Sequence, residues 1–333
     1  MKQPIKTLQK MLATACCLSM LAAPAFAAET PLVKPEAGTF KMGIEPWLGY
    51  GQWHVANSLE LFKQQGLDKV DIINFAEDKD INAALASGQI DAANIATHTA
   101  MGMVSAGLPV KIVLLLDQSQ TADALIVGPG IKTLSDLKGK QVAYEEGTTS
   151  DILLHSALAS AGMKWSDIVP VPMPADAAGS ALIAKRVSAA VTYEPYLSMA
   201  KKQDADVKML YSGESDPGLI SDVLVVRDEV IKSRPGQVAA MIKSWDAALR
   251  HYQHNTAADR AIIAKQVGAS PADLASAFDG VKYYSLAENK QVLSEHFAKH
   301  TFAHVLKAAT EAKLVSKPVT PENLIDARFV NGL

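Results

Sequence analysis

Two short segments of the chain carry aromatic and carboxylate side chains of the kind that bind small molecules. Glu45, Trp47 and Tyr50 lie in one glycine-containing segment, and Tyr193 and Glu194 lie in another. Aromatic faces and carboxylates together bind amines and guanidinium groups through cation–π contacts and charge-assisted hydrogen bonds. The alternative interpretation is structural: the aromatic residues would be hydrophobic anchors beneath a loop, and Glu45 would be a solvated or helix-capping acid. The first chemistry that these residues predict is capture of a nitrogen-containing group.

Residues 144–151 form a third candidate segment, which is rich in hydroxyl groups. Thr148 and Asp151 have the spacing of a capping box at the start of a helix. The free N–H groups at the same helix start also suit a carboxylate, a sulfonate or nitrate. We therefore expect Glu145, Thr148 and Thr149 to form a polar wall of the binding site.

The predicted strand exits are acidic. Among them His98 is expected to be the only potential cation, with no lysine or arginine, and the acids are Glu45, Asp117, Asp123, Glu145, Glu146, Glu194 and Asp222. A simple anion would be held by helix ends and hydroxyl groups alone, whereas an amine, guanidinium-like or amide solute would find carboxylates and aromatic faces. The sequence therefore favours a zwitterion or a cation, with nitrate or a plain sulfonate as the alternative.

Metal and enzyme motifs are weak or missing. His296, His300 and His304 are spaced by four on one helical face, like a metal ladder. Metal sites need further ligands and outer-shell support, so we expect an exposed polar face, no metal and no cofactor. The sequence has no G-x-S-x-G, H-E-x-x-H, P-loop or dinucleotide fingerprint. These features favour a binding protein over an enzyme.

An internal repeat indicates which elements position these residues. Residues 84–95 align without a gap with residues 181–192, which lie 97 positions further on. In each copy the end of a small-residue helix runs through a polar turn into a short apolar strand, and a loop follows: residues 96–99 in one and residues 193–196 in the other. The repeat predicts two similar α/β lobes that each offer a loop to a shared cleft.

Hydrophobic periodicity extends this pattern along the chain. The first series has strands at residues 40–44, 70–75, 90–95 and 112–116, a helix that ends at Gly66 and a helix at residues 81–87. The unbroken apolar run at residues 112–116 is typical of a parallel strand that is covered on both faces. The second series has strands at residues 124–127, 141–144, near 169 and 189, and at 207–211, with a helix at 151–161.

The end of the chain is expected to return to the first series. Residues 222–226 are predicted to cross back, and the pattern from Arg234 onward is helical, so the C-terminal helices should pack on the first lobe. Alternating strands and helices indicate parallel sheets covered by helices, and ligands bind beyond the carboxyl ends of such strands. The cleft is therefore expected between the lobes.

The N-terminus has the features of an export signal. Residues 1–28 combine a basic start, an apolar stretch and the cleavage pattern Ala25-Phe26-Ala27, and both cysteines of the chain lie within them. The apolar stretch is shorter than the 18 or so residues that a spanning helix needs. Removal of this segment lowers the formal net charge from −3 to −6, which argues against nucleic acid as a partner. We expect an exported protein without disulfides.

Four segments together resemble the periplasmic solute-binding proteins of ABC importers in the nitrate, sulfonate and taurine group. They are residues 45–50 (EPWLGY), 86–93 (ASGQIDAA), 136–143 (DLKGKQVA) and 189–195 (AAVTYEP). The chain departs from the family pattern where Arg186-Val187-Ser188 replaces the usual Gly-x-Val-Asp. The resemblance covers roughly residues 41–226.

The resemblance implies an α/β, two-lobed periplasmic binding protein of type II, with parallel-sheet lobes, a hinge and a central cleft. Lobe 1 would comprise residues 39–118 and 224–333, lobe 2 residues 119–223, and the hinge would lie near residues 117–123 and 221–224. Such a protein is expected to be a monomer that closes on one small solute and presents it to a membrane permease. Thiamine-precursor synthases resemble this family too, so an enzyme of the same fold is the other alternative.

Overall fold

The computed structural model describes residue 1, residues 34–75 and residues 78–333. From residue 34 onward these belong to one compact unit, Pro31–Leu333. The predicted export signal at residues 1–28 lies outside the described residues. Within the described part of the chain, no helix is both long and apolar enough to span a membrane.

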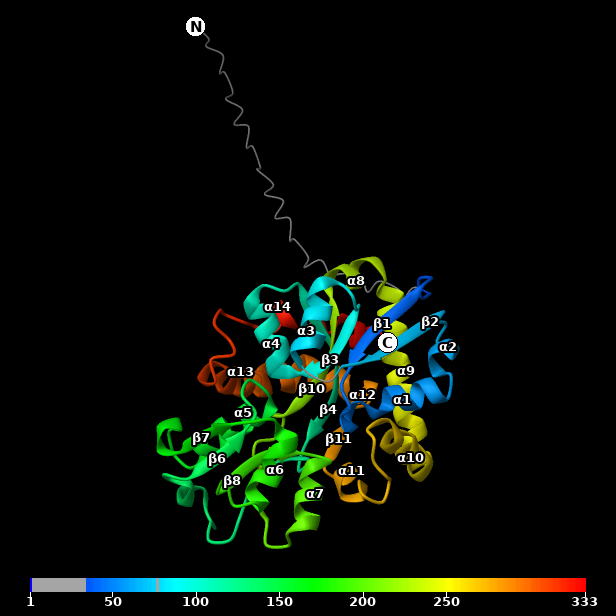
Figure 1. Cartoon of the computed structure of the whole chain (residues 1–333). Coiled ribbons are helices and arrows are strands. Elements are labelled where there is room, and N and C mark those ends of the chain that lie inside the picture. The colour runs from blue at the N-terminus through cyan, green and yellow to red at the C-terminus, as the bar shows by residue number, and fades with distance from the viewer. Residues whose placement is uncertain (2–33, 76–77) are drawn as a thin grey trace. The chain divides into compact units, whose positions relative to one another are not determined.

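Two mixed β-sheets organise the folded unit (Figure 1). The six-stranded sheet has the order β11-β4-β10-β3-β1-β2, and the five-stranded sheet has the order β7-β6-β8-β5-β9. The strands of the first are β1 (Thr39–Ile44), β2 (Lys69–Asn74), β3 (Ala92–Ala96), β4 (Val110–Ser119), β10 (Ser221–Arg227) and β11 (Val281–Tyr283). Those of the second are β5 (Asp123–Val127), β6 (Gln141–Tyr144), β7 (Val169–Pro172), β8 (Ala189–Tyr193) and β9 (Lys208–Ser212).

The repeated phrase of the sequence occupies equivalent places in the two sheets. β1 pairs in parallel with β2 and β3, and β6 pairs in parallel with β7 and β8. β3 is then bordered by the antiparallel strand β10, and β8 by the antiparallel strand β5. Both of these antiparallel strands immediately follow a passage of the chain from one sheet to the other. The two lobes therefore share one topology, as the repeat predicts.

The strand directions correct one prediction. β4 pairs antiparallel with both β10 and β11, although its apolar run was predicted to mark a parallel strand. Every residue of β4 except Lys111 is buried. A strand covered on both faces reads as continuously apolar whatever the direction of its neighbours, so the run indicates burial and not direction. The sheets are accordingly mixed rather than purely parallel.

Helices cover the faces of both sheets. In the five-stranded sheet, α5 packs on one face, and α6 and α7 pack on the other. Leu125 and Val127 of β5 belong to the hydrophobic cluster that contains α5, whereas Ala124 and Ile126 belong to the cluster that contains α6 and α7. The helices of the first two thirds of the chain are α1 (Gly51–Ser58), α2 (Leu61–Gln64), α3 (Asp78–Ser87), α4 (Thr97–Ala106), α5 (Thr149–Ser160), α6 (Ala175–Ile183) and α7 (Tyr196–Gln203), with the 3-10 turn η1 (Leu48–Tyr50).

The C-terminal third is mainly helical, as predicted, but β11 interrupts it. Its helices are α8 (Asp228–Ser233), α9 (Pro235–His254), α10 (Thr256–Gln266), α11 (Ala275–Asp279), α12 (Leu286–Gln291), a π-helical stretch (Val292–Thr301), α13 (Phe302–Glu311), α14 (Pro321–Leu324) and α15 (Arg328–Asn331). α9 packs on α1. α13 packs on both α4 and α5. The C-terminal helices were expected to pack on lobe 1, and the contact between α13 and α5 corrects that expectation.

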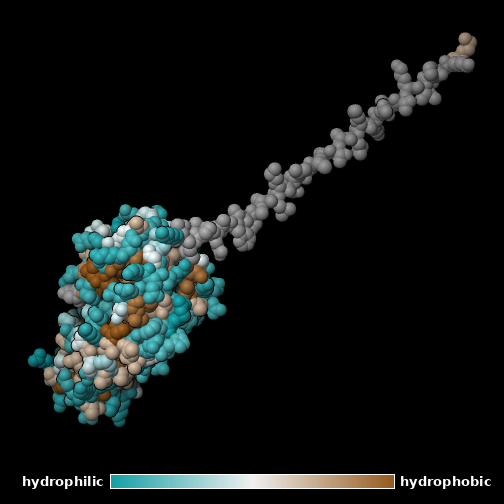
Figure 2. Space-filling view, turned by 90° about the vertical axis from the view of Figure 1, so that its right-hand side faces the viewer, coloured by the Kyte–Doolittle hydropathy of each residue, from teal (hydrophilic) through white to brown (hydrophobic). Residues whose placement is uncertain are grey.

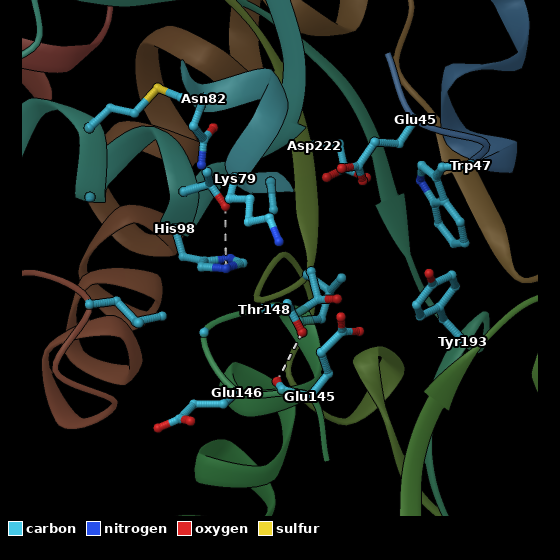
Figure 3. Close-up of a pocket in the computed structure, with 18 of the residues that line it drawn as sticks. Glu45, Trp47, Lys79, Asn82, His98, Glu145, Glu146, Thr148, Tyr193 and Asp222 are labelled. Carbon is cyan, nitrogen blue, oxygen red and sulfur yellow. Dashed lines mark hydrogen bonds between the residues drawn. The ribbon is translucent and has the colours of Figure 1, made fainter. Parts of the chain in front are cut away.

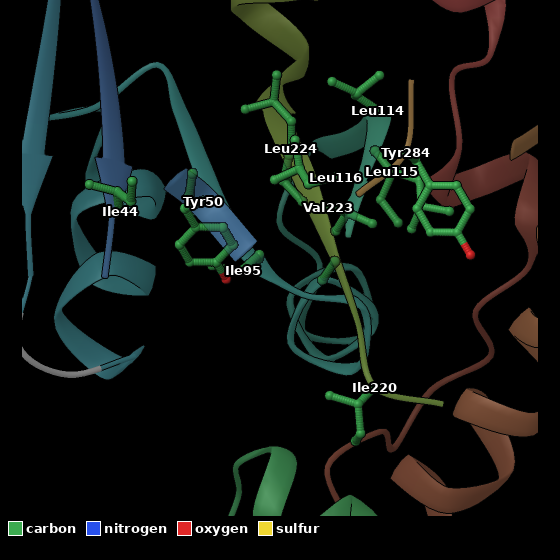
Figure 4. Close-up of a cluster of buried hydrophobic side chains, with 14 of the residues drawn as sticks. Ile44, Tyr50, Ile95, Leu114, Leu115, Leu116, Ile220, Val223, Leu224 and Tyr284 are labelled. Atoms are coloured by element: carbon green, nitrogen blue, oxygen red, sulfur yellow. The ribbon is translucent and has the colours of Figure 1, made fainter. Parts of the chain in front are cut away.

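The core lies around the central strands of the larger sheet. Figure 4 shows apolar side chains from β1, β3, β4 and β10 facing Tyr50 on one side and Tyr284 on the other. Gly43 lies in β1 beneath α3, where a Cβ atom would lie 2.7 Å from Ile90 Cδ1 and 2.8 Å from Ile81 Cγ1. The missing side chain lets α3 approach the sheet closely, which fixes the position of the first turn of α3.

The visible surface is mostly hydrophilic. Figure 2 shows a mainly teal face on which the hydrophobic areas are separate from one another. Among the described residues from 34 onward, the large apolar side chains that are exposed are Val169 and Met199. Since few large apolar side chains are fully exposed, the polar cavity described next is the more informative surface feature.

Candidate functional site

One cavity of about 950 Å³ lies where the ends of strands from both sheets meet. The six-stranded sheet and its connections contribute the β1–η1 loop, α3, α4 and β10 to the lining, and the five-stranded sheet and its connections contribute β5, the β6–α5 loop and β8. A cavity of this volume holds a small organic molecule. Its position beyond the carboxyl ends of β1, β3, β6 and β8 is the one expected for open α/β sheets.

Most of the predicted site residues line this cavity. They are Glu45, Trp47, Tyr50, His98, Glu145, Thr148, Thr149, Tyr193 and Asp222, and Asp123 and Glu146 join them. Figure 3 labels several of these side chains, among them Glu45, Trp47, His98, Tyr193 and Asp222, which come from different elements. The structure thus brings together loops that are far apart in the sequence, whereas Asp117 and Glu194 do not line the cavity.

Glu194 does not line the cavity, although the sequence predicts it as a ligand-binding residue. Its carboxylate accepts hydrogen bonds from the Ser198 backbone N–H at 3.0 Å and from the Ser198 hydroxyl at 2.8 Å. These bonds satisfy donors in the first turn of α7. Alternation along the strand explains its absence from the lining, because the residue that follows Tyr193 faces the opposite side.

Asp117 lies behind the cavity wall rather than in it. Its side chain is fully buried, and its Oδ1 accepts a hydrogen bond of 3.3 Å from the indole N–H of Trp47. Gly49 makes room for this contact, because a Cβ atom there would lie 2.2 Å from Asp117 Oδ2 and 2.2 Å from Trp47 Nε1. Burial and the neighbouring Asp222 carboxylate both raise the pKa of Asp117.

Aromatic side chains form one corner of the cavity. The rings of Trp47 and Tyr193 meet edge to face with centroids 6.2 Å apart, and Tyr193 meets Tyr196 in the same way at 5.5 Å. All three side chains are partly exposed, whereas Tyr50 is buried in the hydrophobic core. Trp47 and Tyr193 therefore offer ring surface to a ligand, and Tyr50 acts mainly as the anchor beneath the loop.

Buried acids adjoin this aromatic corner. Asp123 begins β5 opposite Tyr193, and burial raises its pKa from 3.8 to about 6 despite hydrogen bonds from Ser119 and Thr149. Burial raises the pKa of Tyr193 as well, and Glu145, Glu45 and Asp123 add to this effect through their negative charge. This wall therefore carries a negative potential that a cationic group would relieve.

The opposite wall carries a cation that the sequence reasoning missed. Lys79 and Asn82 of α3 line the cavity together with His98 and Thr99 of α4. In Figure 3 the labelled side chains of Lys79, Asn82 and His98 gather on one side, across from Glu45, Asp222, Trp47 and Tyr193. The sequence reasoning counted only His98 as a cation at the strand exits, and Lys79, in the first turn of α3, adds a second cation to the cavity lining.

Helix starts add to the polar character of the cavity. α4 begins at Thr97 and α5 at Thr149, and residues of both first turns line the cavity. Thr148 caps α5 by accepting a hydrogen bond of 3.3 Å from the Ser150 N–H, while Asp151 accepts one of 3.0 Å from the Gly147 N–H. The cap is therefore present, but Asp151 does not bond to the Thr148 N–H as a capping box requires.

The histidine face does not adjoin this cavity. The rings of His296 and His300 lie 5.3 Å apart, and His304 Nδ1 lies 3.4 Å from an Asp216 carboxylate oxygen. Among the described residues, no group of three or more histidine, cysteine, aspartate or glutamate side chains is arranged to hold a metal ion.

Comparison with known proteins identifies the relatives of the chain. The model of the family described as NMT1/THI5 like matches residues 51–257. An aliphatic sulfonates-binding protein of Escherichia coli is 30% identical over 224 residues, which are 66% of this chain and 69% of the relative. A binding protein of Brucella abortus is 29% identical over 190 residues, or 56% of this chain. That match spans only 58% of the Brucella protein's length.

Solved structures share the fold. The periplasmic aliphatic sulphonate binding protein of Escherichia coli superposes with a TM-score of 0.75 at 22% identity, over 87% of this chain and 92% of that chain. The alkanesulfonate-binding protein of Xanthomonas axonopodis, bound to MOPS, superposes with a TM-score of 0.68 at 20% identity, over 88% and 99% of the chains. The predicted periplasmic binding protein fold is confirmed, and the relatives named here are binding proteins and not enzymes. The chain belongs to the NMT1/THI5-like family.

Proposed function

We propose that this protein is the extracytoplasmic solute-binding component of an ABC importer, and that its ligand is a small zwitterion with an ammonium-type nitrogen and an anionic group. Residues 39–118 and 224–333 would form lobe 1 and residues 119–223 lobe 2. The solute would contact both lobes and thereby favour their closed arrangement, which a membrane permease would recognise. The protein would act in the periplasm as a monomer, after removal of residues 1–28.

The observation that carries the proposal is the opposition of charge across one cavity. Lys79 and His98 belong to the wall formed by α3 and α4, and Glu45 and Asp222 to the wall across from it (Figure 3). A ligand with both charges can satisfy both walls at once. A plain anion would face the carboxylates, and a plain cation would face Lys79.

The α3–α4 wall suits an anionic head group. Lys79 supplies a positive charge, and the first turns of α4 and α5 add backbone N–H groups and hydroxyls. The side-chain oxygen of Asn82 is buried without a hydrogen-bonding partner among the described residues. This oxygen is an acceptor, so it is available to an N–H or O–H donor of a ligand and not to the anionic group itself.

The aromatic corner suits a positively charged nitrogen. Trp47, Tyr193 and Tyr196 present ring surface close to Asp123 and Glu145. Ring faces and carboxylates attract a cation by the same electrostatic field, and partial burial strengthens that attraction. This chemistry supports the nitrogen-containing ligand that the sequence favours.

A plain sulfonate is the second candidate. Lys79 and the helix starts would hold its anionic group, and two of the relatives are named for sulfonates. MOPS, which is bound to the Xanthomonas protein, is a sulfonate that also carries a positive charge when its morpholine nitrogen is protonated. The choice between the candidates depends on whether the carboxylate wall contributes to affinity.

A thermal-shift screen of the processed protein tests the proposal. The probes are 3-aminopropanesulfonate, MOPS, propanesulfonate, propylamine, guanidinium and nitrate. A ligand at 100 times its dissociation constant stabilises the native state by about 2.7 kcal/mol, which gives a clear rise in Tm. We expect a rise with a zwitterion and a smaller one or none with propanesulfonate and propylamine. An equal or larger rise with propanesulfonate would favour the plain sulfonate.

Lys79→Ala shows whether the screen reports on this cavity. Lys63 provides the matched control, because it is an exposed lysine of α2 that does not line the cavity. We expect Lys79→Ala to abolish most of the shift and Lys63→Ala to leave it unchanged. If both variants retain the full shift, the ligand binds elsewhere.

A further inference from the structure

We propose that Asp117 is a positioning residue that shares one proton with Asp222, and that this proton is released when a cationic group binds beside Asp222. The proton-sharing pair follows from the geometry of the strands. The link to a cationic ligand rests on the proposed function. The two parts are tested separately below.

The two carboxyl groups meet because of strand register. Asp117 of β4 and Asp222 of β10 are directly paired in antiparallel strands, and a register irregularity follows immediately, between Asp222 and Val223. Such irregularities re-aim side chains and are frequent next to binding sites. Two ionised carboxylates in this position would repel each other, and like charges directly opposite each other destabilise a strand pair.

The surroundings of Asp117 leave a place for a proton. Its Oδ1 accepts the indole N–H of Trp47, whereas its Oδ2 is buried and accepts no hydrogen bond from any described residue. An ionised oxygen without a donor is costly in such a site. A carboxyl proton shared with Asp222 satisfies that oxygen and removes the repulsion.

In the part of the chain that the structure describes, no cation from the neighbouring elements acts on Asp117. Asp117 interacts electrostatically with four titratable groups. They are Asp222 of β10, Asp123 of β5, Tyr283 of β11 and Tyr284, which follows β11. Among the described residues none of these is a lysine, an arginine or a histidine. The pKa of Asp117 is raised by burial first and by Asp222 second, which agrees with the geometric argument.

The two residues differ in their access to a ligand. Asp222 lines the cavity, whereas Asp117 is fully buried behind it and is held against Trp47. An ammonium group beside Asp222 would stabilise the ionised form of the pair, so the shared proton would leave to solvent while the ligand stays protonated. Asp117 would then tune the charge of Asp222 without contacting the solute.

Carbon-13 NMR of aspartate carboxyl groups tests the pair without any ligand. We expect one carboxyl of the pair to remain protonated at neutral pH in the native protein. Asp222→Asn should lower the titration midpoint of Asp117 by about one pH unit or more, because it removes the negative partner. Asp123→Asn is the matched control and should lower it less, since Asp123 is the weaker of the two neighbours.

The proton-sharing pair is refuted if both carboxyl groups titrate in the ordinary range, or if Asp222→Asn leaves the Asp117 midpoint unchanged. Asp117→Asn provides a second variant that keeps an acceptor for the Trp47 N–H and adds a donor toward Asp222. This variant should fold as the native protein does and should show no shared-proton titration.

Calorimetry tests the coupling to binding, with 3-aminopropanesulfonate as the probe. Titrations in two buffers of different ionisation enthalpy measure the protons exchanged on binding. We expect proton release from the native protein and none from Asp117→Asn. If the probe binds without proton release, the coupling is refuted although the proposed function stands. If the probe does not bind, the proposed function fails and the NMR result still decides on the pair.

Discussion

Trp47 and Tyr193 meet edge to face, with ring centroids 6.2 Å apart and ring planes at 85° to each other. Trp47 follows β1 of the six-stranded sheet, and Tyr193 ends β8 of the five-stranded sheet. The contact therefore joins the two sheets at the edge of the cavity. Opening of the lobes would separate these rings, and closure would return them to a ligand.

Substitution of Trp47 separates the role of its ring from that of its N–H. Trp47→Ala removes ring surface from the cavity, and we expect the affinity for the cognate solute to fall tenfold or more, which corresponds to about 1.4 kcal/mol. Trp47→Phe keeps a smaller aromatic ring and loses the hydrogen bond to Asp117. Its affinity should fall less. Equal affinity of Trp47→Ala and the native protein in calorimetry would place the ligand away from this corner.

Gly49→Ala is expected to disturb the same corner from behind. The new methyl group would lie within 2.2 Å of both the Asp117 carboxylate and the Trp47 indole, so one of them must move. We expect a loss of about 1–3 kcal/mol in the free energy of unfolding, measured by urea denaturation. Gly128→Ala is the control, because the nearest atom would lie 3.8 Å away. Equal stability of the two variants would show that the loop yields without cost.

Glu194→Ala should affect stability rather than binding. The variant leaves the Ser198 N–H and hydroxyl without their acceptor, which costs about 1–3 kcal/mol. We expect a lower Tm and an unchanged dissociation constant for the solute. A tenfold weaker affinity at an unchanged Tm would instead place Glu194 in the site.

The raised pKa of Asp123 predicts a specific dependence of stability on pH. Burial raises its pKa to about 6, so between about pH 4 and pH 6 the folded state binds this proton more readily than the unfolded state does. Its contribution to the free energy of unfolding therefore falls as the pH rises through this interval. Asp123→Asn should remove that fall and stabilise the protein by about 1–3 kcal/mol at pH 7.

The quantity to compare is the free energy of unfolding of Asp123→Asn minus that of the native protein, at each pH. Burial lowers the pKa of His54 to about 4, so His54 has the opposite effect on stability over the same interval. Both proteins contain His54, and its contribution cancels in the difference measured by denaturation from pH 4 to pH 7. A difference that is independent of pH would show that Asp123 is not protonated in the folded state near pH 5.

Much of this architecture was predictable from local sequence. The repeat at residues 84–95 and 181–192 marks the helix-to-strand units that became α3–β3 and α6–β8. Because strand-exit loops gather at one end of each sheet, most of the residues chosen from those loops line the same cavity. The two exceptions also have local reasons: Glu194 alternates to the other face of β8, and Asp117 lies within β4.

Other features depend on packing that local sequence does not encode. The direction of β4 could not be read from its apolar run, since burial on both faces gives the same pattern in either direction. Leu314 lines the cavity only because α13 packs against both α4 and α5. Lys79 was overlooked because α3 begins at Asp78 rather than at residue 81, as predicted, so that the first turn of this helix lines the cavity.

The central claim is that one ligand satisfies both walls of the cavity, and isothermal titration calorimetry with 3-aminopropanesulfonate, propanesulfonate and propylamine tests it most directly. These three compounds share one carbon chain and differ only in which charges they carry. We predict that the zwitterion binds at least about ten times more tightly than either of the others, and that Lys79→Ala removes most of its advantage over propylamine. Binding of propanesulfonate as tightly as the zwitterion, by the native protein, would contradict it.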